Sequence, residues 1–178
     1  TPGKRVILIQ APAGFGKTTL LSSWIFNKKI RPHTCWISHD KRDNDPLTFW
    51  SYVVEAFNHR LPEICNKSAL LLQSIKNYAF EDVLIAMIND IEKSGKPFIL
   101  ILDDYHLIDN EIIHDGVNFL IDHPVDNLLI IISTRRKPAL GLSRVRVSGG
   151  LLEIREAQLK FSKTEMIQFI NNFTDISL

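Results

Sequence analysis

The chain has 178 residues, 45% hydrophobic and 23% charged, a composition typical of a globular domain and unlike that of disordered or fibrous chains. Its 21 basic and 20 acidic side chains nearly cancel, which argues against a free-standing nucleic-acid binder. The two cysteines form no metal-ligand motif, no signal segment opens the chain, and the apolar runs are far shorter than the ~18 residues that span a bilayer. We therefore expect a cytoplasmic protein without membrane contact and, since the chain begins at Thr1, a piece of a longer one.

Short continuous apolar runs alternate with helical patterns, as expected for a parallel sheet with helices on both faces. In chain order, the expected strands are Val6–Gln10, Cys35–Ser38, Pro97–Leu102, Leu128–Ser133 and Leu151–Ile154. The expected helices are Lys17–Lys28, a helix that Asp45 caps and Pro46 begins, a helix through Phe80–Ile91 that Gly95 ends, Glu111–Asp122, and a last helix after the capping box of Ser162 and Glu165. No element is assigned to the loop His39–Asp45, to the segment Leu61–Tyr78 or to the Arg-rich stretch after Ser133.

The segment Ala11–Thr19, APAGFGKTT, joins the first strand to the first helix, which is the context of a phosphate-binding loop. Glycines in this loop let successive backbone N–H groups converge on phosphate oxygens, and the helix N-terminus favours the same anion. Lys17 is expected to reach the β and γ phosphates, and the Thr18 hydroxyl to ligate Mg²⁺. The candidate nucleotide-binding residues are Gly14, Phe15, Gly16, Lys17, Thr18 and Thr19. The motif's usual first glycine is replaced by Ala11.

Two acids, Asp103 and Asp104, directly follow a buried strand, which places them at the carboxyl edge of the sheet, where open α/β sheets bind ligands. Asp103 is predicted to hold Mg²⁺, directly or through water. Asp104 is predicted to be catalytic and to orient or deprotonate an attacking water. Adjacent acids at a strand end are by themselves a weak signal, often only a helix N-cap, and the upstream phosphate loop gives them their functional interpretation.

Arg135 follows the strand that ends in Ser133 and Thr134. If that strand lies between the other two, Arg135 emerges close to the γ-phosphate and can report whether that phosphate is present, so we count it among the catalytic candidates. The neighbouring basic residues are expected at the surface. His106 and His114 are expected to be structural, because the sequence offers them no ligand partners.

These segments resemble the nucleotide-binding domain of the signal-transduction ATPases with numerous domains (STAND), and within that class the large MalT-like, LuxR-type transcriptional activators. The resemblance rests on APAGFGKTTLLSSW, on DNDPLTFW (Asp43–Trp50), on LILDDYHLI (Leu100–Ile108), on the S-T-R that ends at Arg135, and on LLEIREAQLKFSKTE (Leu151–Glu165). The phosphate loop is shared by many unrelated NTPases. Its combination with the other four segments is far more specific.

The resemblance implies an α/β P-loop NTPase fold of the additional-strand type, with the strand before Arg135 between the phosphate-loop strand and the Asp103 strand. It implies a P-loop domain over residues 1–160 and the start of a helical segment over 161–178. It further implies a switch: ADP or no nucleotide at rest, Mg-ATP and a small-molecule inducer in a self-associated active form, and slow ATP hydrolysis as the reset. Inducer and DNA bind domains absent from this chain, so it is not expected to contact DNA.

Two alternatives remain open at this point. In a small P-loop kinase, RRKPALGLSRVR (Arg135–Arg146) would be an Arg-bearing lid over a phosphoryl acceptor, although no acceptor-binding constellation is visible. In a degenerate scaffold, the fold would persist without nucleotide. The presence of Lys17, Thr18 and Asp103 argues against the scaffold.

Overall fold

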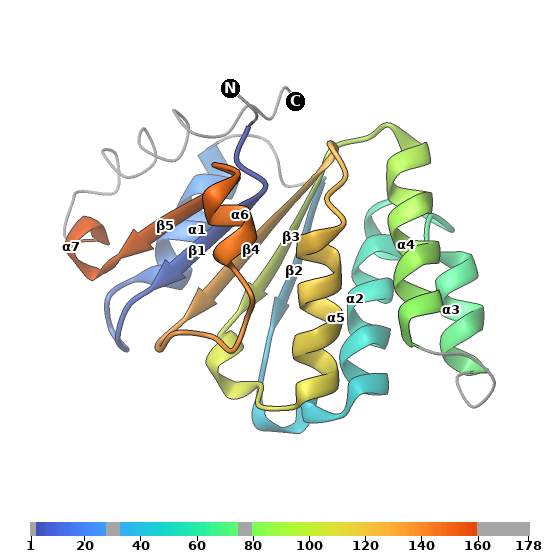
Figure 1. The fold of residues 1–178 in the computed structure, drawn as a ribbon, viewed down its shortest axis with the longest axis horizontal. Helices are drawn as coiled ribbons and strands as arrows, with labels where there is room; N and C mark the ends of the chain where they lie inside the picture. Colours follow the sequence, from blue (N-terminus) through green and yellow to red (C-terminus); the bar gives the residue numbers. More distant parts are fainter. Residues whose placement is uncertain (1–2, 28–32, 75–79, 160–178) are drawn as a thin grey trace.

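Five parallel strands form the central sheet of the computed structural model, which describes residues 3–27, 33–74 and 80–159. The strands are β1 (Val6–Gln10), β2 (Thr34–Ser38), β3 (Phe98–Asp103), β4 (Leu128–Thr134) and β5 (Leu151–Arg155). Their order across the sheet is β2-β3-β4-β1-β5, and every neighbouring pair is parallel (Figure 1). This order confirms the P-loop NTPase fold, with β4 between the phosphate-loop strand β1 and the Asp103 strand β3.

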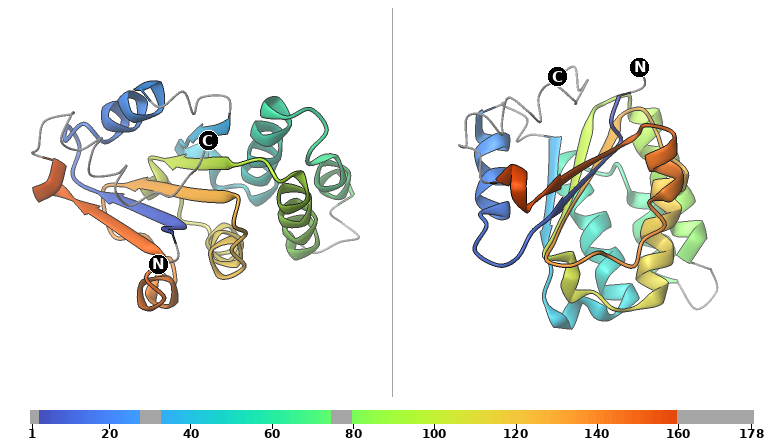
Figure 2. Two further views of the ribbon diagram at one scale, coloured as in Figure 1. Left: turned by 90° about the horizontal axis from the view of Figure 1, so that it is seen from above. Right: turned by 60° about the vertical axis from the view of Figure 1, so that its left-hand side comes forward.

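Helices cover both faces of this sheet, as Figure 2 shows. The helices are α1 (Lys17–Asn27), α2 (Pro46–Arg60), α3 (Asn66–Gln73), α4 (Phe80–Ser94), α5 (Glu111–Asp122), α6 (Ser143–Val147) and α7 (Glu156–Leu159), with 3-10 turns η2 (Lys41–Asn44) and η4 (Tyr105–Leu107). One core cluster lies between the sheet and α2, α4, α5 and α6, and a second lies between the sheet and α1. β3 and β4, in the middle of the sheet, are buried at every residue, which explains why their sequences are continuous apolar runs.

The predicted strands and the four predicted helices within the described residues are confirmed, with boundary shifts of one or two residues. Asp45 caps α2 through a 2.8 Å bond that its carboxylate accepts from the Thr48 N–H, and Pro46 is the first helical residue. Five elements were not predicted: η2, α3, η4, α6 and α7. The helix expected after Ser162 and the domain boundary at residue 160 fall outside the described ranges. None of the described helices is long and apolar enough to cross a membrane.

Candidate nucleotide-binding site

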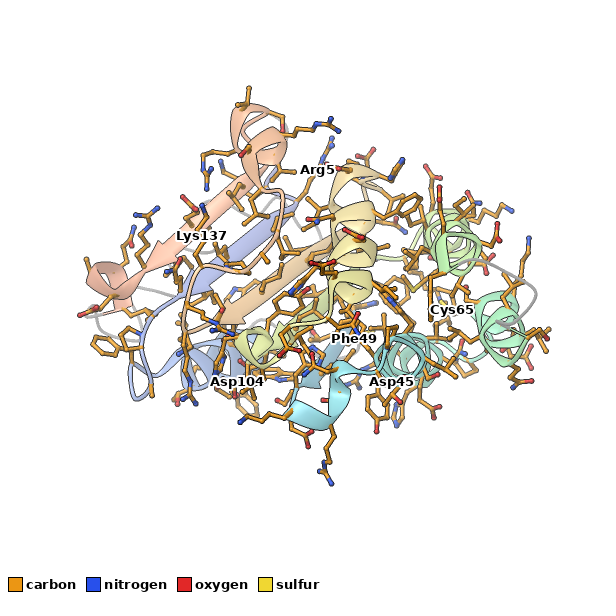
Figure 3. All side chains as sticks on the ribbon, turned by 60° about the horizontal axis from the view of Figure 1, so that its bottom comes forward. Arg5, Asp45, Phe49, Cys65, Asp104 and Lys137 are labelled. Carbon is orange, nitrogen blue, oxygen red and sulfur yellow. The ribbon has the colours of Figure 1, made fainter. Side chains whose placement is uncertain are left out.

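The predicted site residues come from neighbouring strand ends at one edge of the sheet. The register pairs the last residue of β1, Gln10, with the last residue of β4, Thr134, and the N–H of Ala11 donates to the Thr134 carbonyl at 3.2 Å. Asp103 ends β3, on the other side of β4. Figure 3 looks onto this edge, with Asp104 at the start of the turn that follows β3. The fold therefore brings the phosphate loop, the two acids and the loop after β4 together.

The phosphate loop has the backbone that its glycines allow. Gly14 and Gly16 have φ values of 82° and 73°, in the left-handed region that favours glycine. A Cβ at either position would meet no described atom within 4 Å, so the surface above the loop is open. Phe15 is half-buried beside them, whereas Thr19 is exposed on the first turn of α1. This open surface, at the N-terminus of α1, suits a phosphate group.

Lys17 folds back across the phosphate loop. Its ammonium donates to the carbonyls of Ala11 at 2.7 Å and Pro12 at 3.0 Å, and the side chain is buried. Burial lowers the pKa of Lys17, and the nearby charge of Arg135 lowers it further, whereas the carboxylates of Asp104 and Asp103 act to raise it. The charges of three residues from two other strand ends therefore act on this ammonium.

Thr18 and Asp103 form a direct pair across the site. The Thr18 hydroxyl donates to Asp103 Oδ2 at 3.0 Å, although the two residues are 85 positions apart in the chain. Asp103 is 1% exposed, and its other oxygen accepts the N–H of Asp104 at 3.0 Å. A hydroxyl and a carboxylate are the oxygen ligands that Mg²⁺ prefers, with water and phosphate oxygens completing its octahedron. The pair fits this ion, and no cluster of three or more His, Cys, Asp or Glu side chains offers another metal site within the described residues.

Asp104 has a neighbour that the sequence analysis assigned to a structural role. Asp104 adopts a left-handed backbone, with φ 54° and ψ 33°, and precedes the single turn of η4 without a capping hydrogen bond from its side chain. That turn brings His106 back over the site, with Nδ1 3.6 Å from Asp104 Oδ1 and the side chain 10% exposed. Nδ1 is buried and has no hydrogen-bond partner among the described residues. In the sequence, this contact is indicated only by the position of His106 two residues after Asp104. That spacing becomes informative once the backbone conformation is known.

The electrostatics of His106 tie it to the other strand ends. Burial lowers the pKa of the imidazole, and Arg135 lowers it further, with smaller contributions of the same sign from Lys17 and Arg136. Asp104 acts in the opposite direction. The ring is therefore neutral at pH 7 and presents one N–H donor. The structure places Nδ1 of this ring 3.6 Å from Asp104 Oδ1.

The loop after β4 begins at the site and is attached to η4. Arg135 is exposed, and its charge lowers the pKa of both Lys17 and His106, which indicates that it lies near both groups. Arg136 was predicted to be an ordinary surface residue. Its guanidinium donates to the His106 carbonyl at 3.2 Å, and its own carbonyl accepts the Thr134 hydroxyl at 2.7 Å. Arg136 therefore links the end of β4 to the loop that carries Asp104.

A second histidine lies behind the acids, at the end of β2. The N–H of His39 donates to the Asp103 carbonyl at 3.0 Å, and its ring stacks on Phe49 with centroids 4.9 Å apart. Both ring nitrogens are buried without a hydrogen-bond partner among the described residues. Burial lowers the pKa of His39 to about 4, although Asp43, Asp103 and Asp104 act to raise it. His39 is therefore neutral at physiological pH.

Comparison with known proteins shows that the chain is similar to one group of transcriptional regulators. The chain is similar to the HTH-type transcriptional regulator MalT of Klebsiella pneumoniae subsp. pneumoniae, with 34% identity over 167 residues, covering 94% of the chain and 18% of the regulator. MalT of Cronobacter sakazakii is 35% identical over the same shares, and that of Serratia proteamaculans is 34% identical over 96% of the chain and 19% of the regulator. The chain thus spans less than a fifth of the length of these curated relatives, and no family model matches it.

Among solved structures, the chain is similar to Cdc6p from Pyrobaculum aerophilum, with a TM-score of 0.57 and 13% sequence identity. The match covers 87% of this chain and 40% of Cdc6p. At this identity the likeness concerns the fold alone. It supports the P-loop NTPase architecture that the strand order already indicates.

Proposed function

This chain is a MalT-like P-loop domain, and we propose that it is the ATP- and ADP-binding switch of a larger transcriptional regulator. The observation that carries the proposal is the 3.0 Å bond between Thr18 and Asp103, because it pairs the two expected magnesium ligands beside the phosphate loop. A domain that no longer bound nucleotide would not need this hydroxyl–carboxylate pair beside Lys17. The proposal therefore favours a working site over a degenerate scaffold.

In this proposal, the phosphate loop binds the nucleotide through its N–H groups and the N-terminus of α1. Lys17 exchanges the carbonyls of Ala11 and Pro12 for the β and γ phosphates. Thr18 and Asp103 hold Mg²⁺, which when bound neutralises charge on the phosphate oxygens. The free energy of nucleotide binding is then the gain from the new phosphate contacts minus the loss of the contacts that Lys17 already makes with the two carbonyls.

Hydrolysis is assigned to Asp104 with two supporting residues. The Asp104 carboxylate, 35% exposed, accepts a hydrogen bond from the attacking water and orients it toward the γ-phosphate. The His106 ring supports that carboxylate from the protein side, because its Nδ1 lies 3.6 Å from Asp104 Oδ1 and a shift of less than 1 Å would form a hydrogen bond. Arg135 contacts the γ-phosphate and so distinguishes ATP from ADP.

The switch follows from that distinction. A ligand shifts a conformational equilibrium only by its differential affinity for the two states, and Arg135 gives ATP a contact that ADP lacks. We infer that the full-length protein self-associates when it binds ATP and an inducer, and that slow hydrolysis returns it to the ADP form. Inducer and DNA are bound by other parts of the protein, in the cytoplasm.

The alternative of a small kinase requires a mobile lid after β4. In the described structure the segment is anchored, because Leu140, Leu142 and Val145 are buried in the main core cluster. The Gly141 N–H donates to the Asn118 side chain at 2.8 Å, which fixes the segment to α5. These contacts support a fixed connection between β4 and β5 and favour the switch over the kinase.

Nucleotide binding by the full-length protein tests the proposal. Charge-assisted hydrogen bonds are worth about 1.5–3 kcal/mol, so Lys17→Ala should weaken Mg-ATP and Mg-ADP binding by about 10- to 150-fold. Lys67→Ala, an exposed lysine on α3, is the matched control and should bind like the wild type. Titration calorimetry measures all three proteins, with circular dichroism to check folding. Absence of binding at millimolar ATP and ADP in the wild type would contradict the proposal.

A further inference from the structure

The turn η2, between β2 and α2, binds the loop that carries Asp104 and His106. Asn44 Nδ2 donates to the Leu107 carbonyl at 2.8 Å, and Asn44 Oδ1 accepts the Asp109 N–H at 2.7 Å. The Asn110 side chain donates to the Asn44 carbonyl at 3.0 Å. One residue thus satisfies a backbone donor and a backbone acceptor of a segment more than sixty positions away, much as a neighbouring strand would.

Asn44 is itself held in place by a capped turn. The Asp40 carboxylate accepts the Arg42 N–H at 2.6 Å, and the buried Asp43 carboxylate accepts the Asp40 N–H at 2.8 Å, which forms a capping box around η2. Asn44 also donates to the Lys41 carbonyl at 3.2 Å, and the next residue, Asp45, caps α2. Contacts within the turn itself therefore hold Asn44 in place, in addition to its contacts with the loop.

The loop from Asp104 to Asn110 is also anchored to the core, because Tyr105 is 1% exposed with its hydroxyl 2.8 Å from His114 Nδ1 and Ile108 is buried in the main core cluster. Its own backbone makes one turn, in which Leu107 donates to Asp104 at 3.0 Å and Ile108 donates to Tyr105 at 3.1 Å. Arg136 holds the loop from the β4 side, through an exposed contact with the His106 carbonyl. Asn44 adds contacts with the backbone of Leu107, the residue after His106 in the single turn of η4, and with that of Asp109.

We propose that Asn44 is a positioning residue for ATP hydrolysis, which holds the Leu107–Asp109 backbone so that Asp104 and His106 keep their places at the site. This inference rests on the proposed function and extends it to the turn before α2. Asn44 acts through backbone hydrogen bonds and does not touch the nucleotide. Its loss therefore affects the rate of the chemical step and leaves the affinity for nucleotide in place.

Asn127 provides a matched control at the opposite, amino edge of the sheet. Its side chain also donates to two backbone carbonyls, those of Ile91 at 2.6 Å and Lys96 at 2.9 Å, and it joins segments more than thirty positions apart. Asn127→Ala and Asn44→Ala thus remove similar contacts at the two ends of the same sheet. A general loss of stability would affect both variants alike, whereas a positioning role belongs to Asn44 alone.

The experiment measures single-turnover hydrolysis, ATP and ADP affinity, and amide hydrogen exchange in the full-length protein. Asn44→Ala should lower the hydrolysis rate about tenfold or more, because misplacing a catalytic group by about 1 Å costs up to about 100-fold. Nucleotide affinity should stay within about twofold, and exchange should quicken in peptides that contain the Asp109 amide. Asn127→Ala should hydrolyse ATP at the wild-type rate.

A second variant keeps the test valid if Asn44→Ala fails to fold. Asn110→Ser retains an oxygen to cap α5, where Asn110 Oδ1 now accepts the Ile112 N–H at 3.0 Å, and loses the donor to Asn44. One lost hydrogen bond predicts a rate lower by about 2- to 10-fold. Wild-type rates in Asn44→Ala or in Asn110→Ser, or an equal loss in Asn127→Ala, would overturn the inference alone. A wild type that binds ATP without hydrolysing it would overturn the proposed hydrolysis and this inference together.

Discussion

Replacement of His106 tests the arrangement around Asp104 most directly. His106→Asn keeps an N–H donor close to the position of Nδ1, which lies 3.6 Å from Asp104 Oδ1. His106→Gln places its donor farther out, near the position of Nε2, and His106→Leu removes the donor while keeping an apolar side chain. The three variants separate the polar contact with Asp104 from the space that the ring fills.

The magnitude follows from the chemistry of the pair. At 3.6 Å the contact is longer than a hydrogen bond, and a shift of less than 1 Å would make it one. Since burial and Arg135 lower the pKa of His106, the ring is neutral and contributes an N–H dipole to the Asp104 carboxylate. Hydrogen bonds to charged groups are worth about 1.5–3 kcal/mol, which corresponds to about 10- to 150-fold in rate. His106→Leu should lose this factor, and His106→Asn should stay within about threefold of the wild type.

Single-turnover hydrolysis of Mg-ATP by the full-length protein measures these rates, with ATP and ADP affinity determined in parallel. Affinity should change by less than about threefold in all variants, because His106 acts on the carboxylate and not on the phosphates. His123→Asn is the control for loss of an imidazole, since His123 stacks on Phe119 at the exposed end of α5. Equal rates in His106→Leu and the wild type, or equal losses in the Leu and Asn variants, would refute the assignment.

The remaining predictions concern the acids, the arginine and the buried histidine. Asp103→Asn should weaken Mg-dependent nucleotide binding, whereas Asp104→Asn should bind nucleotide normally and lose hydrolysis. Calorimetry and single-turnover assays distinguish the two variants, and equal losses of binding would show that the roles are wrongly assigned. Arg135→Ala should weaken ATP binding by about 10- to 150-fold and leave ADP binding nearly unchanged; an equal fall in both affinities would exclude a γ-phosphate contact. His39 has a pKa of about 4 in the folded protein and about 6.5 in the unfolded chain. Between about pH 6.5 and about pH 4 the unfolded chain therefore binds a proton at His39 that the folded protein does not bind. As a result, the free energy of unfolding falls by about 3 kcal/mol as the pH drops through this window. His39→Leu should remove that part of the pH dependence, and urea denaturation at pH 7, 5.5 and 4.5 measures it; an unchanged slope would contradict the assignment to His39.

The parts of this fold that could be predicted are those in which the sequence carries its own pattern. β3 and β4 are buried on both faces, so their residues must all be apolar until the chain reaches the edge of the sheet. The helix Glu111–Asp122 was predicted with the limits that α5 has, because its buried positions recur at helical spacing after the cap at Asn110. The phosphate loop was predictable for a similar reason, since its glycines, lysine and threonine are consecutive.

The elements that were missed have no such pattern. α3 has eight residues, of which only Ser68 and Leu72 are buried, so it presents no apolar stripe. It is helical because it packs against α2 and α4, and the buried Ser68 hydroxyl donates to the Val83 carbonyl of α4 at 3.1 Å. α6 has five residues and buries Val145 against the main core. Tertiary contacts decide both helices, and a single sequence does not contain those contacts.

The same distinction runs through the site. The residues predicted for it, from Lys17 to Arg135, follow strand ends, and strand ends are fixed by the sheet. His106 reaches the site from a loop, Arg136 and Asn44 hold that loop, and the contacts of all three depend on the path of the backbone. Asn44 is the clearest case, because its sequence neighbours predict only a turn and a helix cap. The functional roles of all these residues remain predictions.

Under the proposed function, these loop contacts would also connect nucleotide sensing to hydrolysis. Arg135 and Arg136 are adjacent, so we expect a γ-phosphate that draws Arg135 toward the phosphate loop to displace Arg136 as well, whose guanidinium donates to the His106 carbonyl at 3.2 Å. On the opposite side, Asn44 holds the same loop at Leu107 and Asp109, with shorter contacts of 2.8 and 2.7 Å. The buried Tyr105, bonded to His114 at 2.8 Å, also fixes this loop, and the exposed contact of Arg136 is the longest of the side-chain hydrogen bonds that hold it. Under the proposed function, we therefore expect ATP binding to displace His106, and with it Asp104, from the β4 side.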